Sequence, residues 1–304
     1  MLSAWPFFVS KVMLRKGQAQ VRTKAGGGDP IKDRLFIGTL GIDCIEYSRR
    51  CVDSVNTDVE AVKFCYMDNG STEDSLNIIR NWNIKNSDIT EFEVVENGYN
   101  AGVGIGWNML IKKALEWGAT KILICNNDIA FGPHTLNGLC SAYDQLRASI
   151  PETVMVTAAN RTKNPEELAG IAQEWNFHEH PDFSCYMITP ETIERLGLLS
   201  EAYVPAYFED NDYHHRILLS GYKAWGTDWA PYSHVASRTR YAHPNLVTHE
   251  VFRRNRQQFY DTFHVTGPDQ EIEDQRREAF YKANPDAEPH QPWTVVLEWA
   301  LENM

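Results

Sequence analysis

The cysteines of this chain lack any C-x-x-C pair, and most of the six lie in or beside apolar runs. That arrangement favours buried free thiols in a reducing compartment over a disulfide framework or a zinc cluster. Long apolar runs are also missing. The opening MLSAWPFFVSKVMLRK is too short to span a bilayer, and its basic residues follow the apolar part, where a signal peptide has them first. We therefore expect a cytoplasmic protein without a transmembrane segment.

Basic residues are scarce, because 29 Lys and Arg face 41 Asp and Glu and leave a formal net charge of −12 at pH 7. Polyanion binding requires Lys and Arg that displace counterions from phosphates, so this balance argues against a dedicated nucleic-acid-binding surface. With 43% hydrophobic residues over 304 positions, the chain can nevertheless bury a full core. Its length suits one large domain or two small ones.

From Arg34 onward, short apolar runs alternate with amphipathic stretches of helical periodicity. Four such strand–helix units in succession predict an α/β fold, with a mostly parallel central sheet flanked by helices on both faces. Such sheets bind ligands at the carboxyl ends of their strands. The expected pairs are RLFIGTL with residues 45–55, VKFCYM with 75–82, FEVVE with 106–117, and KILIC with 135–148.

After VMVTA the alternation weakens, and residues 160–182 have the composition of a loop-rich insertion. The expected later elements are a strand FSCYMIT, helices over 190–196 and 209–220, and a short strand before residue 234. We divide the chain into a polar, glycine-rich N-terminal arm and linker (1–33), a globular domain (34–245) and a helical C-terminal extension (246–304). The apolar WTVVLEWAL near the end could pack back on the domain or form a homo-oligomer through the C-terminal helices.

Polar side chains follow the strand VKFCYM, which ends in MDNGSTEDS. Asp68 can accept hydrogen bonds from a ribose hydroxyl or a base N–H, and Asn69 and Gly70 permit a sharp turn. Taken alone, however, the same letters describe an ordinary turn followed by a helix cap.

The next strand ends in NGYNAGVGIGWN, whose glycines let the backbone approach a ligand closely. The helix that follows offers unpaired N–H groups to a phosphate. A dinucleotide fingerprint is not complete here, because Trp107 stands where G-x-G-x-x-G requires its third glycine.

The strand KILIC runs directly into Asn126, Asn127 and Asp128. A carboxylate at the tip of a central strand contributes little to folding but is well placed to hold a hard divalent cation, which prefers oxygen ligands and bridges a diphosphate. We therefore take Asp128 as a candidate metal ligand. A helix N-cap is the alternative role for this segment.

The segment AYFEDNDYHHRI gathers Glu209, Asp210 and Asp212 at the start of an expected helix. The helix dipole favours acids there, which gives the cluster a structural explanation. The preceding Tyr207 and Phe208 suggest in addition a walled pocket in which a carboxylate can act as a general base. Downstream, His234 can add an imidazole ligand to the metal, although a lone histidine is more often structural.

Together and in this order, these segments resemble the inverting glycosyltransferase family 2, particularly its rhamnosyltransferase-like members. The resemblance rests on DNGSTEDS, NAGVGIGWN with ALEWGA, LICNND, FEDNDYHHR and PYSH, and it extends from about residue 35 to residue 238. It implies a GT-A (Rossmann-like) fold and a metal-dependent, inverting transfer of a sugar. The donor would be a UDP- or dTDP-type nucleotide sugar, and the acceptor group a hydroxyl.

The resemblance also implies roles for individual residues. Asp210, with Glu209 beside it, would be catalytic, and Asp210 would be the general base. Asp128 and His234 would hold Mn²⁺ or Mg²⁺. The nucleotide-sugar contacts would come from Asp68, Asn100, Gly102, Asn108, Asn126, Asn127 and Asp128.

Two positions depart from the family pattern. Asn126 occupies the first position of the DXD-like motif, which removes one direct carboxylate ligand. The usual His-His-Gly-Gly is reduced to His234, Val235 and Ala236.

Two other functions stay open at the level of sequence: a non-catalytic sugar- or nucleotide-binding protein on the same fold, and a nucleotidyltransferase. The second lacks the basic, glycine-rich loop that such enzymes carry after their first strand. The acceptor also stays open among a glycan, a lipid-linked sugar, a protein, a metabolite and a modified nucleic-acid base, because fold and donor site do not determine it.

Overall fold

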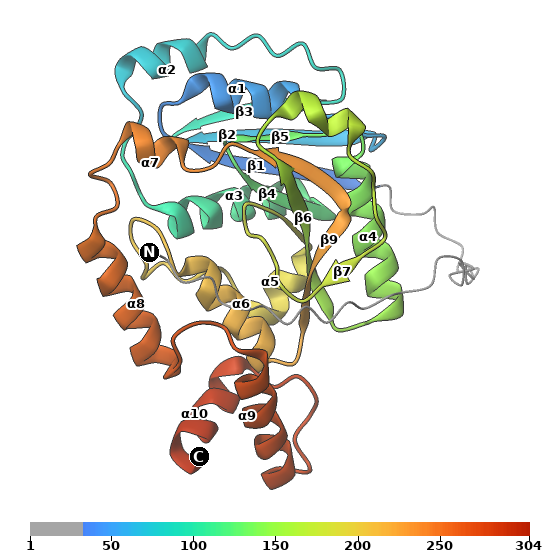
Figure 1. Ribbon diagram of the computed structural model, residues 1–304, viewed down its shortest axis with the longest axis vertical. Coiled ribbons are helices and arrows are strands. Elements are labelled where there is room, and N and C mark those ends of the chain that lie inside the picture. Colours follow the sequence, from blue (N-terminus) through green and yellow to red (C-terminus); the bar gives the residue numbers. More distant parts are fainter. Residues whose placement is uncertain (1–32) are drawn as a thin grey trace.

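The computed structural model describes residues 33–304, in which one mixed sheet carries helices on both faces (Figure 1). The strands are β1 (Arg34–Gly41), β2 (Ala61–Asp68), β3 (Glu91–Glu96), β4 (Lys121–Asn126), β5 (Ile129–Phe131), β6 (Thr153–Thr162), β7 (Phe177–His178), β8 (Cys185–Ile188) and β9 (Lys223–His234). The expected N-terminal arm and linker lies outside the described residues, except for Asp33.

The helices follow the strands in the order that the sequence predicts. They are α1 (Ile45–Asp53), α2 (Glu73–Arg80), α3 (Val103–Trp117), α4 (Thr135–Ser149), the 3-10 turn η1 (Pro165–Gly170), α5 (Pro190–Leu196), α6 (Glu209–Leu219), α7 (Arg238–Ala242), α8 (His249–Phe263), α9 (Gln270–Ala283) and α10 (Trp293–Asn303). The four expected strand–helix units, the helix at 190–196 and the helical C-terminal extension are all confirmed. None of the helices in this described part of the chain is long and apolar enough to cross a bilayer.

The strand order β3-β2-β1-β4-β8-β6-β9-β5 combines a parallel half with a mixed half. β1 pairs in parallel with β2 and β4, and β2 pairs in parallel with β3. β8 is antiparallel to both β4 and β6, and β5 is antiparallel to β9. The α/β class with a mostly parallel sheet flanked by helices is therefore confirmed.

The later strands differ most from the sequence prediction. A short strand was expected before residue 234, but β9 has 12 residues and pairs with β5, β6 and β7. Its sequence KAWGTDWAPYSH contains Gly, Asp and Pro, which are depleted in strands, and the pairing of β6 with β9 shifts register between Ala158 and Ala159. The expected insertion at 160–182 likewise contains the end of β6, η1 and β7.

Successive residues of each inner strand supply opposite faces of the sheet, so two apolar cores form. In β1, Leu35 and Ile37 join the core beneath α1 and α4, whereas Phe36 joins the core beneath α3 and α6. Five of the six cysteines are buried and all six are free, as the sequence predicts.

A third core joins the C-terminal extension to α6. Phe259 and Phe263 of α8 and Val296 of α10 are fully buried there, together with Phe208 and Leu219 from the α6 region. The extension thus packs back on the domain, and Figure 1 shows α8, α9 and α10 gathered at the α6 side of the molecule. The domain boundaries and a homo-oligomer stay predictions.

Candidate functional site

The parallel register brings three strand ends to one edge of the sheet. Asp68, the last residue of β2, is paired with Gly41 of β1, and Asn126, the last residue of β4, is paired with Leu40. A cavity of about 360 Å³ opens at this edge. Its lining includes seven of the residues predicted from the sequence: Asn100, Asn126, Asn127, Asp128, Glu209, Asp210 and His234.

The pairing of β5 with β9 places Asp128 beside His234. Ile129 is the register partner of His234, and the Val235 N–H donates to the Asp128 carbonyl at 3.1 Å, so the two side chains are neighbours. Asp128 Oδ1 lies 3.0 Å from His234 Nε2, and Asp128 Oδ2 accepts from the backbone N–H of Arg238 at 3.2 Å. Burial raises the Asp128 pKa, but the hydrogen bond and charge of His234 outweigh it, so the pKa falls below its ordinary value.

On another wall of the cavity, the start of α6 provides a pair of acids. Glu209 is buried, and its Oε2 has no hydrogen-bond partner among residues 33–304. Burial, with the charge of Asp210 second, raises the Glu209 pKa to about 8, so this carboxyl is protonated at neutral pH. Burial also raises the pKa of Asp210, whose Oδ1 accepts from the Asn211 N–H at 2.8 Å.

Comparison with known proteins gives a fold but no close relative. No protein-family model and no curated protein matches the sequence. A mannosyltransferase from Pyrobaculum calidifontis, PcManGT, in complex with GDP-Man and Mn²⁺, matches with a TM-score of 0.53 and 16% identity over 89% of this chain and 72% of its own. GalNAc-T7 with UDP, GalNAc and Mn²⁺ matches with a TM-score of 0.56 and 12% identity over 91% of this chain and 57% of its own.

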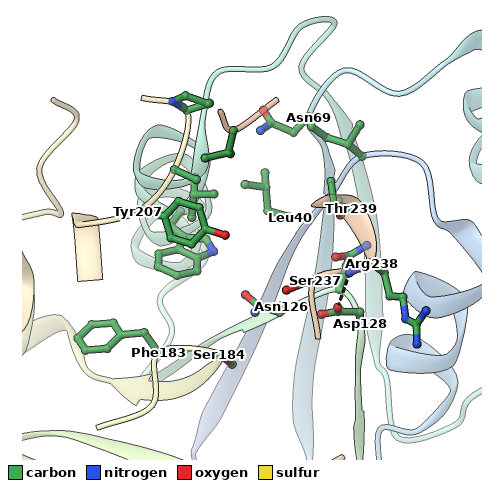
Figure 2. A pocket seen from close by; sticks show the side chains of 18 of the residues that line it. Leu40, Asn69, Asn126, Asp128, Phe183, Ser184, Tyr207, Ser237, Arg238 and Thr239 are labelled. Carbon is green, nitrogen blue, oxygen red and sulfur yellow. Dashed lines mark hydrogen bonds between the residues drawn. The ribbon is translucent and has the colours of Figure 1, made fainter. Parts of the chain in front are cut away.

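The chain has the GT-A fold. The cavity therefore lies at the carboxyl edge of a GT-A sheet, where β1, β2 and β4 end. In Figure 2, Tyr207 lies on one side of this cavity, and Asp128 and Arg238 lie on the other. Membership of family 2, and of its rhamnosyltransferase-like branch, stays a prediction.

Three predicted residues of the GT-A domain are not among the described residues that line the cavity. Asp68 is fully buried, and its Oδ2 accepts from the N–H groups of Gly70 and Ser71 at 3.1 and 3.2 Å. Its neighbour Asn69 lines the cavity instead. Asn108 is also buried and is bonded through both amide atoms to Leu199. Their donor contacts stay predictions.

Gly102, the third of these residues, acts through the backbone. Its φ of +92° and its approach to Pro205 both require glycine, because a Cβ here would lie 3.0 Å from the Pro205 carbonyl oxygen. The Val103 N–H donates to that same oxygen at 2.7 Å. Asn100 Oδ1 accepts from the Gly102 N–H at 2.9 Å, which joins the glycine loop to the cavity wall.

The GT-A cavity also contains residues that belong to no motif of the sequence. Asp182 and Ser184 lie between β7 and β8, in the stretch expected as an insertion and the strand after it. Asp182 accepts from the Tyr232 hydroxyl at 2.8 Å and from the Ser184 N–H at 2.9 Å. Asp182 could not be predicted as a site residue from the sequence, because a single acid in a loop-rich stretch matches no motif. Its place in the cavity depends on the pairing of β8 with β4.

The Asp128–His234 pair fits a divalent cation. Asp128 would offer a carboxylate oxygen and His234 an imidazole nitrogen, and both side chains line the cavity. Within residues 33–304 there is no group of three or more His, Cys, Asp or Glu side chains that could hold a metal ion. Two protein ligands suit Mg²⁺ or Mn²⁺ only if substrate phosphates and waters complete the coordination.

The third acid of α6, Asp212, has a structural role instead. It is buried, its Oδ1 accepts from Arg216 Nε at 2.8 Å, and its Oδ2 accepts from the Tyr203 hydroxyl at 3.3 Å. Arg216 also donates to the carbonyls of Leu196 and Leu198 at 3.0 Å, so the pair ties α6 to the end of α5.

Replacing Asp212 with Ala is expected to lower the free energy of unfolding by about 3–5 kcal/mol, because it leaves the Arg216 guanidinium buried without its counter-charge. Urea denaturation measures the change. Asp261→Ala, an exposed position on α8, is the control and should change stability by less than about 0.5 kcal/mol. A loss below about 1 kcal/mol for Asp212→Ala would show that the pair is not needed for the fold.

Proposed function

We propose that this protein is a glycosyltransferase that transfers a sugar from a nucleoside-diphosphate sugar to an acceptor hydroxyl with inversion, using Mn²⁺ or Mg²⁺. The observation that carries the proposal is the meeting of two unlike pairs in one GT-A cavity: Asp128 with His234, and Glu209 with Asp210. The first pair suits a cation and a diphosphate. The second suits proton transfer.

The similar structures support the donor class. PcManGT holds GDP-Man and Mn²⁺, and GalNAc-T7 holds UDP, GalNAc and Mn²⁺. Asn100, Asn126 and Asn127 offer amide groups to the donor along the same cavity. We propose a UDP- or dTDP-type donor, as the family resemblance implies, and leave Asp68, Gly102 and Asn108 as further donor-site candidates.

The reaction is a direct displacement. The Asp210 carboxylate accepts the proton of the acceptor hydroxyl as its oxygen bonds to the anomeric carbon of the sugar. The bond from that carbon to the phosphate oxygen breaks at the same time, and its electron pair leaves with the nucleoside diphosphate. Because attack and departure occur on opposite faces, the configuration inverts.

The remaining residues of the site bind and orient. Asp128 and His234 would hold the cation, which supplies positive charge for the departing diphosphate when it is bound. Glu209 is protonated at neutral pH, so it offers a hydrogen-bond donor to a sugar hydroxyl rather than a second base. Leu40, Trp107 and Tyr207 line the same cavity, and their apolar side chains suit the apolar face of a sugar ring.

Release of a nucleoside diphosphate tests the function without knowledge of the acceptor. The protein is incubated with Mn²⁺ and, separately, UDP-, dTDP- and GDP-sugars, and we expect slow release of the diphosphate from one donor class with water as acceptor. Calorimetry with the same panel measures binding. Binding without any release would favour a non-catalytic nucleotide-sugar-binding protein, and release of pyrophosphate from a nucleoside triphosphate and a sugar phosphate would favour a nucleotidyltransferase.

A further inference from the structure

The turn that precedes Glu209 and Asp210 has an unfavourable backbone. Tyr207 and Phe208 have φ values of +74° and +81°, a region that side-chain-bearing residues rarely occupy. Phe208 is the N-cap residue of α6, but no side-chain hydrogen bond caps the helix. Such conformations persist only where surrounding contacts stabilise them, so residues outside the turn must stabilise this backbone.

The contacts come from α8, in the C-terminal extension. Asn255 of α8 is 0% exposed. Its Nδ2 donates to the carbonyl oxygens of Ala206 and Tyr207 at 2.9 and 3.2 Å. Its Oδ1 accepts from Arg254 at 3.0 Å, and Arg254 also donates to the Val204 carbonyl. Both amide atoms of Asn255 are therefore hydrogen-bonded. Together, Arg254 and Asn255 of α8 donate to the carbonyls of Val204, Ala206 and Tyr207.

Aromatic packing reinforces these bonds at the same point. Phe252 lies 5.7 Å from the Tyr207 ring and 5.3 Å from the Phe208 ring, and Phe259 lies 5.7 Å from Phe208. The apolar contacts fix the side chains of the turn, whereas the amide fixes its carbonyls. An apolar residue would fill the Asn255 position at lower desolvation cost, so a buried amide at this place indicates a need for its two donated hydrogen bonds.

We infer that Asn255 is a positioning residue for the reaction, which holds the turn at 206–208 so that Tyr207 faces the cavity and Asp210 faces the acceptor hydroxyl. The inference rests on the proposed function, because it assigns Asn255 a role through the general base. It also places a determinant of the active site outside the region of family resemblance, which ends near residue 238.

The test compares Asn255→Ala and Asn255→Asp with the unaltered protein. Asp keeps the volume and the acceptor for Arg254, but an ionised Asp cannot donate to the two carbonyls. Urea denaturation of both variants shows whether each is folded at the assay temperature. We expect the turnover of donor hydrolysis to fall by at least about 10-fold in both variants, towards the roughly 10²-fold cost of a 1 Å misplacement. The dissociation constant of UDP with Mn²⁺, measured by calorimetry, should stay within about twofold, because Asp128, His234 and Asn126 are untouched.

A pH profile separates positioning from general stability. Burial is the largest cause that raises the pKa of Asp210, and the charge of Asp182 raises it further; Asp210 in turn acts on the neighbouring Glu209. A loosened turn admits water and lowers that pKa, so the acidic limb of the rate profile should move to lower pH in Asn255→Ala, which adds no charge of its own. Destabilisation elsewhere in the extension would not move it.

Asn284→Ala is the matched control, because Asn284 of the α9 C-terminus also donates to a backbone carbonyl, that of Phe280 at 2.9 Å, but does not contact the turn. It should leave turnover and the pH profile unchanged. Turnover within twofold of the unaltered protein in Asn255→Asp would overturn the inference alone, and so would loss of UDP binding in that variant. Absence of diphosphate release from the unaltered protein with every donor would overturn the proposed function and the inference with it.

Discussion

Replacing Asp210 with Asn is expected to slow release of the nucleoside diphosphate by about 10³-fold, because general base catalysis typically contributes 10²- to 10⁴-fold. The amide has the size of the carboxylate but cannot take the proton. Asp210 lines the cavity and, within residues 33–304, is not hydrogen-bonded to Asp128 or His234, so the dissociation constant of the nucleotide should change little. Steady-state turnover and calorimetry on the same preparation measure the two effects.

Glu209→Gln is the matched control for this experiment. Because burial, with the charge of Asp210 second, raises the Glu209 pKa to about 8, the residue is protonated at neutral pH and Gln reproduces that state. We expect Glu209→Gln to retain far more activity than Asp210→Asn at pH 7. Equal losses in the two variants, or near-normal turnover in Asp210→Asn, would remove Asp210 from the role of base.

The pH dependence follows from the same burial. Asp210 acts as a base only when it is deprotonated, so the rate rises with pH through its pKa. Burial raises that pKa above its ordinary value of 3.8, and the acidic limb should therefore lie above pH 3.8.

Replacing Asp128 with Asn is expected to cost about 10³-fold in turnover and to weaken the dependence on Mn²⁺. A bound cation supplies several kcal/mol of charge stabilisation, and each 1.36 kcal/mol is a factor of ten in rate. Asp128 is the carboxylate of the candidate pair, and His234 alone would leave one protein ligand. Titration of Mn²⁺ in the release assay should give a higher midpoint for the variant than for the unaltered protein.

Chelation provides the complementary measurement. EDTA should abolish release by the unaltered protein, and Mn²⁺ or Mg²⁺ should restore it. Asp228→Asn is the control, because Asp228 belongs to the same strand as His234 but is paired with Arg161 at 3.2 Å outside the cavity. Full activity of Asp128→Asn in EDTA would rule out the cation from the reaction.

The sequence predicted the parts of the fold that depend on local pattern. The apolar runs of β1, β2 and β4 are short, and each is followed by a stretch of helical periodicity, so their place in a parallel sheet could be predicted from local pattern alone. The position of Asp128 at the cavity could be predicted for the same reason, since a carboxylate directly after a buried strand reaches the carboxyl edge wherever that strand lies in the sheet.

Features that depend on distant partners could not be predicted. β9 forms despite Gly226 and Pro231 because β6 and β5 pair with it along its length. The direction of a side chain could not be predicted either. Asn108 belongs to the NAGVGIGWN motif, yet its amide is hydrogen-bonded to the backbone of Leu199. The contacts of Asn255 could not be predicted from the residues around it, because the carbonyl groups to which it donates lie almost 50 positions earlier in the chain.

The apolar core shared by α6 and the C-terminal helices also bears on synthesis. The N-terminal part of a chain emerges from the ribosome first, and domains generally fold as they emerge. Phe208 precedes its packing partners Phe252 and Phe259 by more than 40 residues, so a nascent chain that has completed the sheet still lacks the ring contacts of this turn. Catalytic competence is therefore expected to arise late in translation, after α8 has left the exit tunnel.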